Sequence, residues 1–308
     1  MNAAGAGLLA AAGALGACSL YETRHFVRLD YEIRSSLLSP AWNGVKAVFI
    51  SDLHEKSYGR GNQRLKQAIA DAGPQMILIG GDMIITKRGA DPDFEVSTDL
   101  LRFLSARWPV YYAPGNHERR MLDSPELYPG WKEEVFGAIR AAGVHYLSNR
   151  TETLSRGGSR LYLTGLDLSR VYYLRGNAAR PGGRTIERLA GPAHGDGFNL
   201  LLAHNPAYAE YYARWGADCT LSGHFHGGLV RVPRLGGLVS PELKIFSPYT
   251  GNLVEKGGMP EIISSGLGTH TVNVRLLNRP QLIVLHFTGT MRGERPERPG
   301  KTSVRLLR

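Results

Sequence analysis

The sequence contains only two cysteines, Cys18 and Cys219, among its 308 residues. Two cysteines cannot form the disulfide framework of a small secreted scaffold, and neither belongs to a Cys-x-x-Cys pair. The scarcity of cysteine therefore excludes a disulfide-stabilised fold and a thiolate zinc finger. Any metal ion bound by this chain is expected to have oxygen and nitrogen ligands.

Long basic runs are also absent, although the 37 Lys and Arg residues outnumber the 27 Asp and Glu residues and give a net charge of +10. Because Arg is scattered and no basic arm is present, we expect no specific nucleic-acid binding. The excess positive charge favours other anionic partners, such as a phosphorylated substrate or an anionic membrane surface. A hydrophobic content of 43% indicates a folded globular protein.

No charged residue occurs before Glu22, and Ala, Gly and Leu dominate this N-terminal segment. Its length suits a signal or anchor, but it is weakly hydrophobic and has no basic n-region. Residues 15–18 (LGAC) resemble a bacterial lipobox, in which the cysteine becomes the lipidated N-terminus. We predict membrane association through an N-terminal anchor or a lipid on Cys18. An exported form and a cytoplasmic form are the alternatives.

Composition divides the chain into three parts, and no internal repeat is visible. Residues 1–21 are expected to form a signal- or anchor-like segment outside the fold. Residues 22–287 form the folded domain, and residues 288–308, rich in Arg, Gly and Pro, are expected to be a disordered basic tail.

Strand-like and helix-like segments alternate in the first half of the domain, which indicates an α/β fold with parallel βαβ units. The expected strands are 45–50, 76–79 and 109–113, and the expected helices are 65–72, 96–107 and 131–142. The second half is richer in strands. These are expected at 161–166, 198–203, 217–221, 262–263 and 282–287, with one short helix at 207–215.

Polar residues that bind metals follow the expected strands, where ligands gather in α/β sheets. They are Asp52, His54, Asp82, Asn116, His117, His204, His224 and His226. Carboxylate, amide and imidazole ligands suit Mn²⁺, Fe or Zn²⁺. The set is too large for one ion, but two ions about 3.5–4 Å apart and bridged by a carboxylate would use it.

Each of these residues also has a purely structural interpretation. Asp52 and Asp82 are possible helix N-caps after strands, and Asn116 is a possible turn residue beside Gly115. His204 is a possible loop histidine. Five histidines of ten in these clusters make a structural explanation of the whole set improbable.

The chain contains five polar motifs, which are, in order, Asp52-x-His54, Gly81-Asp82, Gly115-Asn116-His117-Glu118, His204, and Gly223-His224-x-His226. With these motifs the sequence resembles the calcineurin-like metallophosphoesterases, and more closely the membrane-associated bacterial members of that family. The resemblance covers residues 30–287 and implies a two-sheet αββα sandwich. It also implies the metal ligands: Asp52, His54 and His226 for one divalent ion, Asn116, His204 and His224 for the second, and Asp82 between them.

The resemblance further implies a dinuclear phosphoric ester hydrolase, with Asp82 and His117 in catalysis. A hydroxide bridging the metals would attack phosphorus in line, and His117 would protonate the leaving oxygen. We expect a phosphodiesterase. The alternatives are a phosphomonoesterase or protein phosphatase, a nucleoside-diphosphate-lipid pyrophosphatase, and a metal-stabilised binding protein without turnover.

Candidate substrate contacts lie next to these motifs. Arg119 and Arg120 follow the third motif and would contact a second phosphate or an acidic head group. Tyr172 is expected at the rim of the site, which would suit a lipid- or nucleotide-linked ester. A solvated loop is the alternative explanation for both arginines.

Overall fold

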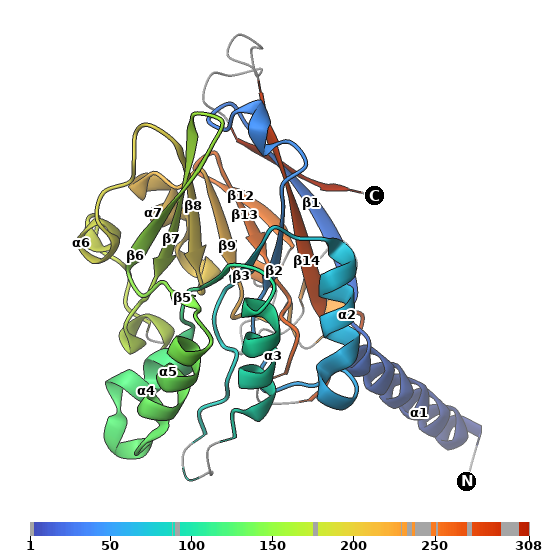
Figure 1. Cartoon of the computed structure of the whole chain (residues 1–308). Coiled ribbons are helices and arrows are strands. Elements are labelled where there is room, and N and C mark those ends of the chain that lie inside the picture. The colour runs from blue at the N-terminus through green and yellow to red at the C-terminus, as the bar shows by residue number, and fades with distance from the viewer. Residues whose placement is uncertain are drawn as a thin grey trace.

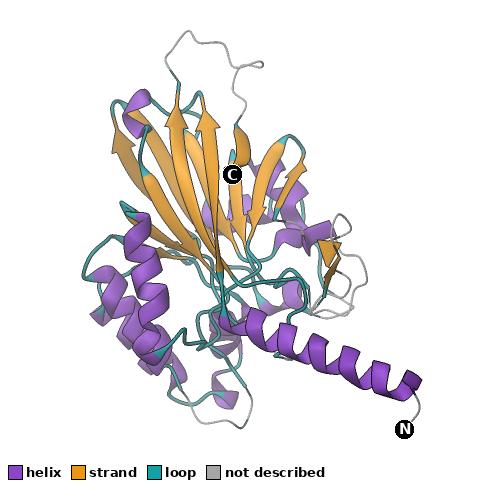
Figure 2. Ribbon diagram, turned by 90° about the vertical axis from the view of Figure 1, so that its right-hand side faces the viewer, coloured by secondary structure: helices purple, strands orange, loops and turns teal. Residues whose placement is uncertain are grey.

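The computed structural model describes residues 3–87, 89, 93–174, 178–228, 230–232, 236–237, 248–250, 252–269, 273–290 and 302–307. These residues form two mixed sheets packed face to face, with helices on both outer sides (Figures 1 and 2). The predicted αββα sandwich is therefore confirmed.

The larger sheet has the strand order β15-β1-β14-β2-β3-β4-β5, and the second has the order β12-β13-β9-β8-β7-β6. Strands of the larger sheet are β1 (Val27–Ser35), β2 (Lys46–Ile50), β3 (Met76–Ile79), β4 (Val110–Tyr112), β5 (His145–Tyr146), β14 (Gln281–Gly289) and β15 (Ser303–Leu307). Those of the second sheet are β6 (Arg150–Arg156), β7 (Ser159–Leu166), β8 (Phe198–Ala203), β9 (Cys219–Ser222), β12 (Leu253–Lys256) and β13 (Met259–Ile263). A short pair, β10 (Arg231–Val232) and β11 (Gly236–Gly237), lies apart.

Helices flank both sheets. They are α1 (Ala3–Arg24), α2 (Gln63–Ala72), α3 (Glu95–Ser105), α4 (Asn116–Asp123), α5 (Trp131–Ala141), α6 (Thr185–Ala190) and α7 (Ala209–Trp215). Side chains of α2, α3 and α5 pack on the outer face of the larger sheet, and those of α6 and α7 pack on the outer face of the second. A third cluster fills the space between the sheets.

Successive side chains of the central strands point to opposite faces, and this alternation explains why both faces of each sheet are apolar. In β2, Val48 and Ile50 face the helices, whereas Ala47 and Phe49 face the other sheet. In a strand, successive side chains point to opposite faces, so a continuous apolar run supplies two core layers at once. The same alternation occurs in β8, where Leu201 faces the helices and Leu200 faces the other sheet.

Parallel pairing determines where the predicted site residues lie. Strands β2, β3 and β4 are parallel neighbours, and so are β7, β8 and β9 in the second sheet. Their carboxyl ends therefore meet at one end of the sandwich. The loops after β2, β3, β4, β8 and β9 carry the polar motifs to this end.

The prediction of disorder for residues 288–308 is wrong at both ends of that segment. Residues 288–289 complete β14, and Ser303–Leu307 form β15, which pairs antiparallel with β1 from Asp30 to Arg34. The strand covers the edge of β1, whose backbone groups would otherwise be unpaired. Residues 291–301 lie outside the described residues.

The N-terminal segment forms α1, which projects from the sandwich (Figure 2). Its last turn nevertheless packs on the domain, because Ser19 is only 9% exposed and Glu22 only 7%. The expectation that residues 1–21 lie wholly outside the fold is therefore wrong at Ser19. Among the described helices, none is long and apolar enough to cross a membrane.

Candidate active site

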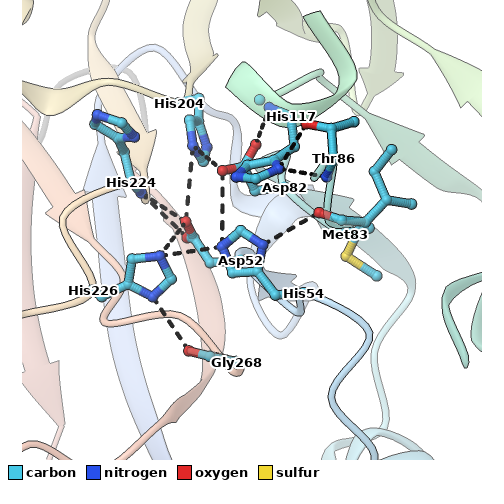
Figure 3. A network of polar contacts seen from close by, with 12 residues as sticks. Asp52, His54, Asp82, Met83, Thr86, His117, His204, His224, His226 and Gly268 are labelled. Atoms are coloured by element: carbon cyan, nitrogen blue, oxygen red, sulfur yellow. Dashed lines mark hydrogen bonds and ion pairs between the residues drawn. The ribbon is translucent and has the colours of Figure 1, made fainter. Parts of the chain in front are cut away.

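The predicted ligands converge at one end of the two sheets (Figure 3). Asp52 and His54 follow β2, and Asp82 follows β3. Asn116 and His117 begin α4 directly after β4, whereas His204 follows β8 and the pair His224 and His226 follows β9. Neither aspartate caps a helix, since Asn62 precedes α2 and Phe94 precedes α3.

Most of these residues have an unusual backbone conformation. The φ angles of Asp52, His54, Asp82, His224 and His226 lie between 48° and 69°, in the left-handed region. Residues other than glycine rarely adopt it, and each such residue costs about 1–3 kcal/mol. The surrounding packing must therefore hold these loops in place, which is typical of a functional site.

Two glycines are required because a carboxylate approaches the backbone closely. A Cβ on Gly223 would collide with Oδ2 of Asp52, and one on Gly115 would collide with Oδ1 of Asp82. These glycines belong to the motifs found in the sequence. Their role is to let both aspartates lie against the neighbouring loop.

The ligand atoms lie within reach of shared cations. Oδ2 of Asp82 is 3.2 Å from Nε2 of His204 and 3.9 Å from Nε2 of His54. Oδ1 of Asp52 is 3.5 Å from Nε2 of His226. Candidate ligand atoms within 4.8 Å of one another form three groups among the described residues: Asp52, His54, His226; His54, Asp82, His117; and Asp82, His204, His224.

Three histidines have the hydrogen-bond arrangement of metal ligands. The Nδ1 atom of His54 lies 3.2 Å from the Ile84 carbonyl, that of His204 lies 2.7 Å from the Gly80 carbonyl, and that of His226 lies 3.2 Å from the Gly268 carbonyl. A carbonyl only accepts, so each Nδ1 carries the proton. In the neutral ring each Nε2 then has a lone pair directed into the site, as in metal-bound imidazoles.

His117 has the opposite arrangement. Its Nδ1 accepts a hydrogen bond from the backbone N–H of Thr86 at 2.8 Å, and the Thr86 hydroxyl lies 2.9 Å away. A neutral His117 therefore carries its proton on Nε2. This polarity makes His117 a hydrogen-bond donor to a bound group, although its ring lies among the possible ligands.

The side chain of Asn116 is also suited to bind a metal. Its buried Oδ1 atom has no hydrogen-bond partner among the described residues. An unsatisfied buried carbonyl costs about 1–3 kcal/mol, and a cation would satisfy it. Two carboxylates, one amide oxygen and four imidazoles form a donor set suited to divalent cations such as Mn²⁺, Fe²⁺ or Zn²⁺.

Each charged group of the site shifts the pKa values of its neighbours. Burial alone would lower the pKa of His204, but the carboxylates of Asp82 and Asp52 outweigh it and raise that pKa to about 10. Burial opposes ionisation of Asp82, yet the imidazoles of His204 and His117 hold its pKa well below its usual range. Without metal, His204 therefore keeps a second proton, on Nε2, beside ionised Asp82, and a bound cation would take the place of that proton.

Glu118 holds two of the ligand loops together, a role that the sequence motif did not reveal. Its Oε2 accepts hydrogen bonds from the N–H groups of Asp82 (2.9 Å) and Gly115 (2.8 Å). Its Oε1 accepts from the Met83 N–H and the Tyr112 hydroxyl. Burial raises the pKa of Glu118, but all four partners are donors and favour the carboxylate.

Of the three candidate substrate residues, Arg119 and Tyr172 lie at one cavity and Arg120 does not line it. Arg120 donates to the Thr86 carbonyl at 2.9 Å. Arg119 pairs with Asp123 (2.7 Å) and Asp167 (3.3 Å). Arg119 and Tyr172 both line a cavity of about 260 Å³.

Tyr173 was expected at the rim of the site together with Tyr172, and it lies beside the candidate ligands. Its ring centre is 5.2 Å from that of His224 and 6.2 Å from that of His204. With Tyr172 it belongs to the 3-10 helix Arg170–Tyr173. This short helix therefore borders both the candidate imidazole ligands and the cavity next to Arg119.

The sequence model described as "Calcineurin-like phosphoesterase" matches residues 45–228, more than half of the 308 residues. The chain belongs to this family. Every predicted metal ligand lies within the matched part. The chain is therefore a metal-dependent phosphoesterase.

Individual proteins with similar sequences carry related names. The uncharacterized metallophosphoesterase YkuE of Bacillus subtilis (strain 168) is 28% identical over 294 residues, 94% of this chain and 95% of that protein. The phosphodiesterase YaeI of Escherichia coli (strain K12) is 26% identical over 246 residues, 79% of this chain and 82% of that protein.

A solved structure is similar as well. A dimetal phosphatase from Danio rerio is 14% identical, with a TM-score of 0.41 over 73% of this chain and 88% of that one.

Proposed function

We propose that this metallophosphoesterase holds two divalent cations and hydrolyses phosphodiesters. Asp52, His54 and His226 would hold one cation, and Asn116, His204 and His224 the other. Asp82 would contact both. When bound, such cations lower the pKa of a water molecule and neutralise charge on the phosphoryl oxygens.

The observation that supports this proposal most directly is the contrast among the buried histidines. Nδ1 of His54, His204 and His226 faces a carbonyl, whereas Nδ1 of His117 faces the N–H of Thr86. Lone pairs and one N–H therefore point into the same site. Lone pairs suit cations, and the N–H suits an oxygen that gains negative charge, such as the leaving oxygen of a phosphoester.

The cavity beside Arg119 would take the alcohol portion of the substrate. Donors and acceptors both line it: Arg119, Asn149, Asp167, Ser169, Thr185 and Arg188. Exposed apolar side chains occur nearby on the same segments, Val171 and Leu174 beside Tyr172, and Leu189 in the lining. A hydroxylated head group with an apolar tail combines these properties, so a lipid-linked phosphodiester is the proposed substrate class.

Membrane association is part of the same proposal. Leu8, Leu9 and Leu15 on α1 are each more than half exposed, and no charged residue precedes Glu22. An apolar helix of this kind lowers its free energy by burying its side chains in lipid. A lipid on Cys18 is the alternative anchor, and it would replace this helix because Cys18 would then become the N-terminus. Recovery of the full-length protein in the soluble fraction of the producing cell would contradict this part.

Hydrolysis of bis-p-nitrophenyl phosphate and p-nitrophenyl phosphate by full-length protein in detergent tests the activity. The protein would be stripped of metal and assayed again after Mn²⁺, Zn²⁺ or Fe²⁺ is restored. We expect metal-dependent turnover that is faster on the diester and is lost in Asp82→Ala. Faster turnover of the monoester would favour a phosphatase instead.

The alcohol site is tested by comparing phosphatidylglycerol in micelles, glycerophosphoglycerol and bis-p-nitrophenyl phosphate. Arg188→Ala should lower kcat/KM about tenfold more on the glycerol esters than on the aryl ester. The control variant Arg184→Ala removes an exposed arginine that lies just before α6 and does not line the cavity. It should leave the ratio of kcat/KM between the glycerol esters and the aryl ester unchanged. Equal effects of both variants would argue against the alcohol site. A preference for phosphatidylglycerol over its soluble analogue would identify the lipid form.

A further inference from the structure

The last turn of α1 is hydrogen-bonded to a loop close to the metal site. Oγ of Ser19 accepts a hydrogen bond from the Arg275 backbone N–H at 3.2 Å. Oε2 of Glu22 accepts one from the Asn278 N–H at 3.0 Å. All four residues are buried. The contact therefore joins the projecting N-terminal helix to the interior of the domain.

Asn278 continues this connection to the fifth motif. Its Nδ2 donates to the carbonyls of His226 (2.6 Å) and Gly228 (2.5 Å). Between them lies Gly227, with φ of 67°, where an added Cβ would be 2.5 Å from Oδ1 of Asn278. The Asn278 side chain therefore fixes the turn that carries the His226 imidazole.

Arg275 makes a second connection, through the side chain of His226. The buried Arg275 guanidinium donates to the carbonyls of Ser265 and Gly268 at 2.7 Å each. The Gly268 carbonyl is also the partner of Nδ1 of His226. Arg275 thus holds the carbonyl that selects the tautomer and orientation of His226.

We infer that Ser19 and Glu22 of α1 are positioning residues for the metal ligand His226. This inference rests on the proposed metal binding by His226. Without the Glu22 carboxylate, the buried Asn278 N–H loses its acceptor, and loop 273–279 relaxes away from the turn at His226. The helix that carries the exposed apolar residues therefore also sets metal affinity at one of the two sites.

Calorimetric titration of metal-stripped, full-length protein with Mn²⁺ in detergent tests the inference without a substrate. In Glu22→Ala we expect the dissociation constant of one site to rise about tenfold, as for other partners of metal ligands. Glu22→Gln keeps an acceptor oxygen and should bind like the wild type. Leu15→Ala changes an exposed position of α1 and should also bind like the wild type.

Two outcomes would overturn the inference. One is a Glu22→Ala protein with wild-type affinity at both sites. The other is equal weakening of both sites together with a lower unfolding temperature in EDTA, since that would indicate general destabilisation. Wild-type protein that binds two Mn²⁺ ions but hydrolyses no phosphoester would contradict the proposed activity and leave this inference intact.

Discussion

The backbone N–H of Thr86 donates a hydrogen bond to Nδ1 of His117 at 2.8 Å. A backbone amide cannot reverse its polarity, so it keeps Nδ1 unprotonated and the proton on Nε2. This neutral tautomer cannot offer an Nε2 lone pair to a metal. Donation to Nδ1 also withdraws electron density from the ring, which strengthens the Nε2–H as a donor.

Replacement of His117 should therefore affect turnover and not metal content. We expect His117→Ala to lower kcat on bis-p-nitrophenyl phosphate about 10²–10⁴-fold. His117→Gln keeps an N–H donor and should recover part of this loss. Elemental analysis should find wild-type metal content in both variants. An unchanged kcat in His117→Ala would refute the role of this histidine.

Asp82→Asn should remove metal while preserving the local backbone. Oδ1 of Asp82 accepts a hydrogen bond from the His117 N–H at 2.8 Å, and asparagine can still accept it. The variant loses the negative charge beside His204 and His54, so we expect fewer than two metal ions per chain and a kcat at least 10³-fold lower. Retention of two ions by elemental analysis would disprove the bridging assignment.

Glu118→Gln should destabilise the loops that carry the ligands. An amide NH₂ would face a backbone N–H where the carboxylate now accepts a hydrogen bond. We expect a loss of about 1–3 kcal/mol in the free energy of unfolding, measured with urea in EDTA. Tyr112→Phe removes only one of the four donors and should cost less, about 0.5–1.5 kcal/mol. A larger loss in Tyr112→Phe would contradict this ranking.

Glu261 should make stability depend on pH. It is fully buried in β13, and burial raises its pKa from 4.5 to about 8, although the Ser222 hydroxyl donates to it at 2.6 Å. Between these two values the folded state binds more protons than the unfolded state, so stability falls as the pH rises.

Urea unfolding of metal-free protein at several pH values measures this effect. The contribution of Glu261 should fall by about 1.4 kcal/mol per pH unit between pH 5 and 8. Glu261→Gln should remove that slope and be more stable than the wild type at pH 8. Glu255→Gln changes the same charge at an exposed position and serves as the control. Parallel stability curves for wild type and Glu261→Gln would contradict the prediction.

Much of the fold could be predicted because the signals are local. The apolar runs at 76–79 and 198–203 coincide with β3 and β8. By contrast, β15 was predicted to be disordered, since its five residues are stabilised by pairing with β1, nearly the whole chain away. Ser19 was assigned to a segment outside the fold for the same reason, because its partner is the distant residue Arg275.

The sequence by itself determined which chemistry is possible, because Asp, Asn and His occur in five ordered motifs after strands. Only the tertiary structure decided how each histidine is used. His117 and His204 are the same residue type, yet one Nδ1 faces an N–H and the other faces a carbonyl. Those partners, Thr86 and Gly80, come from the loop after β3. Thr86 lies beside His117 because β3 pairs with β4 in the same sheet, whereas Gly80 reaches His204 only when the two sheets are packed together. Tautomer and orientation follow from these long-range hydrogen bonds, which no local pattern in the sequence encodes.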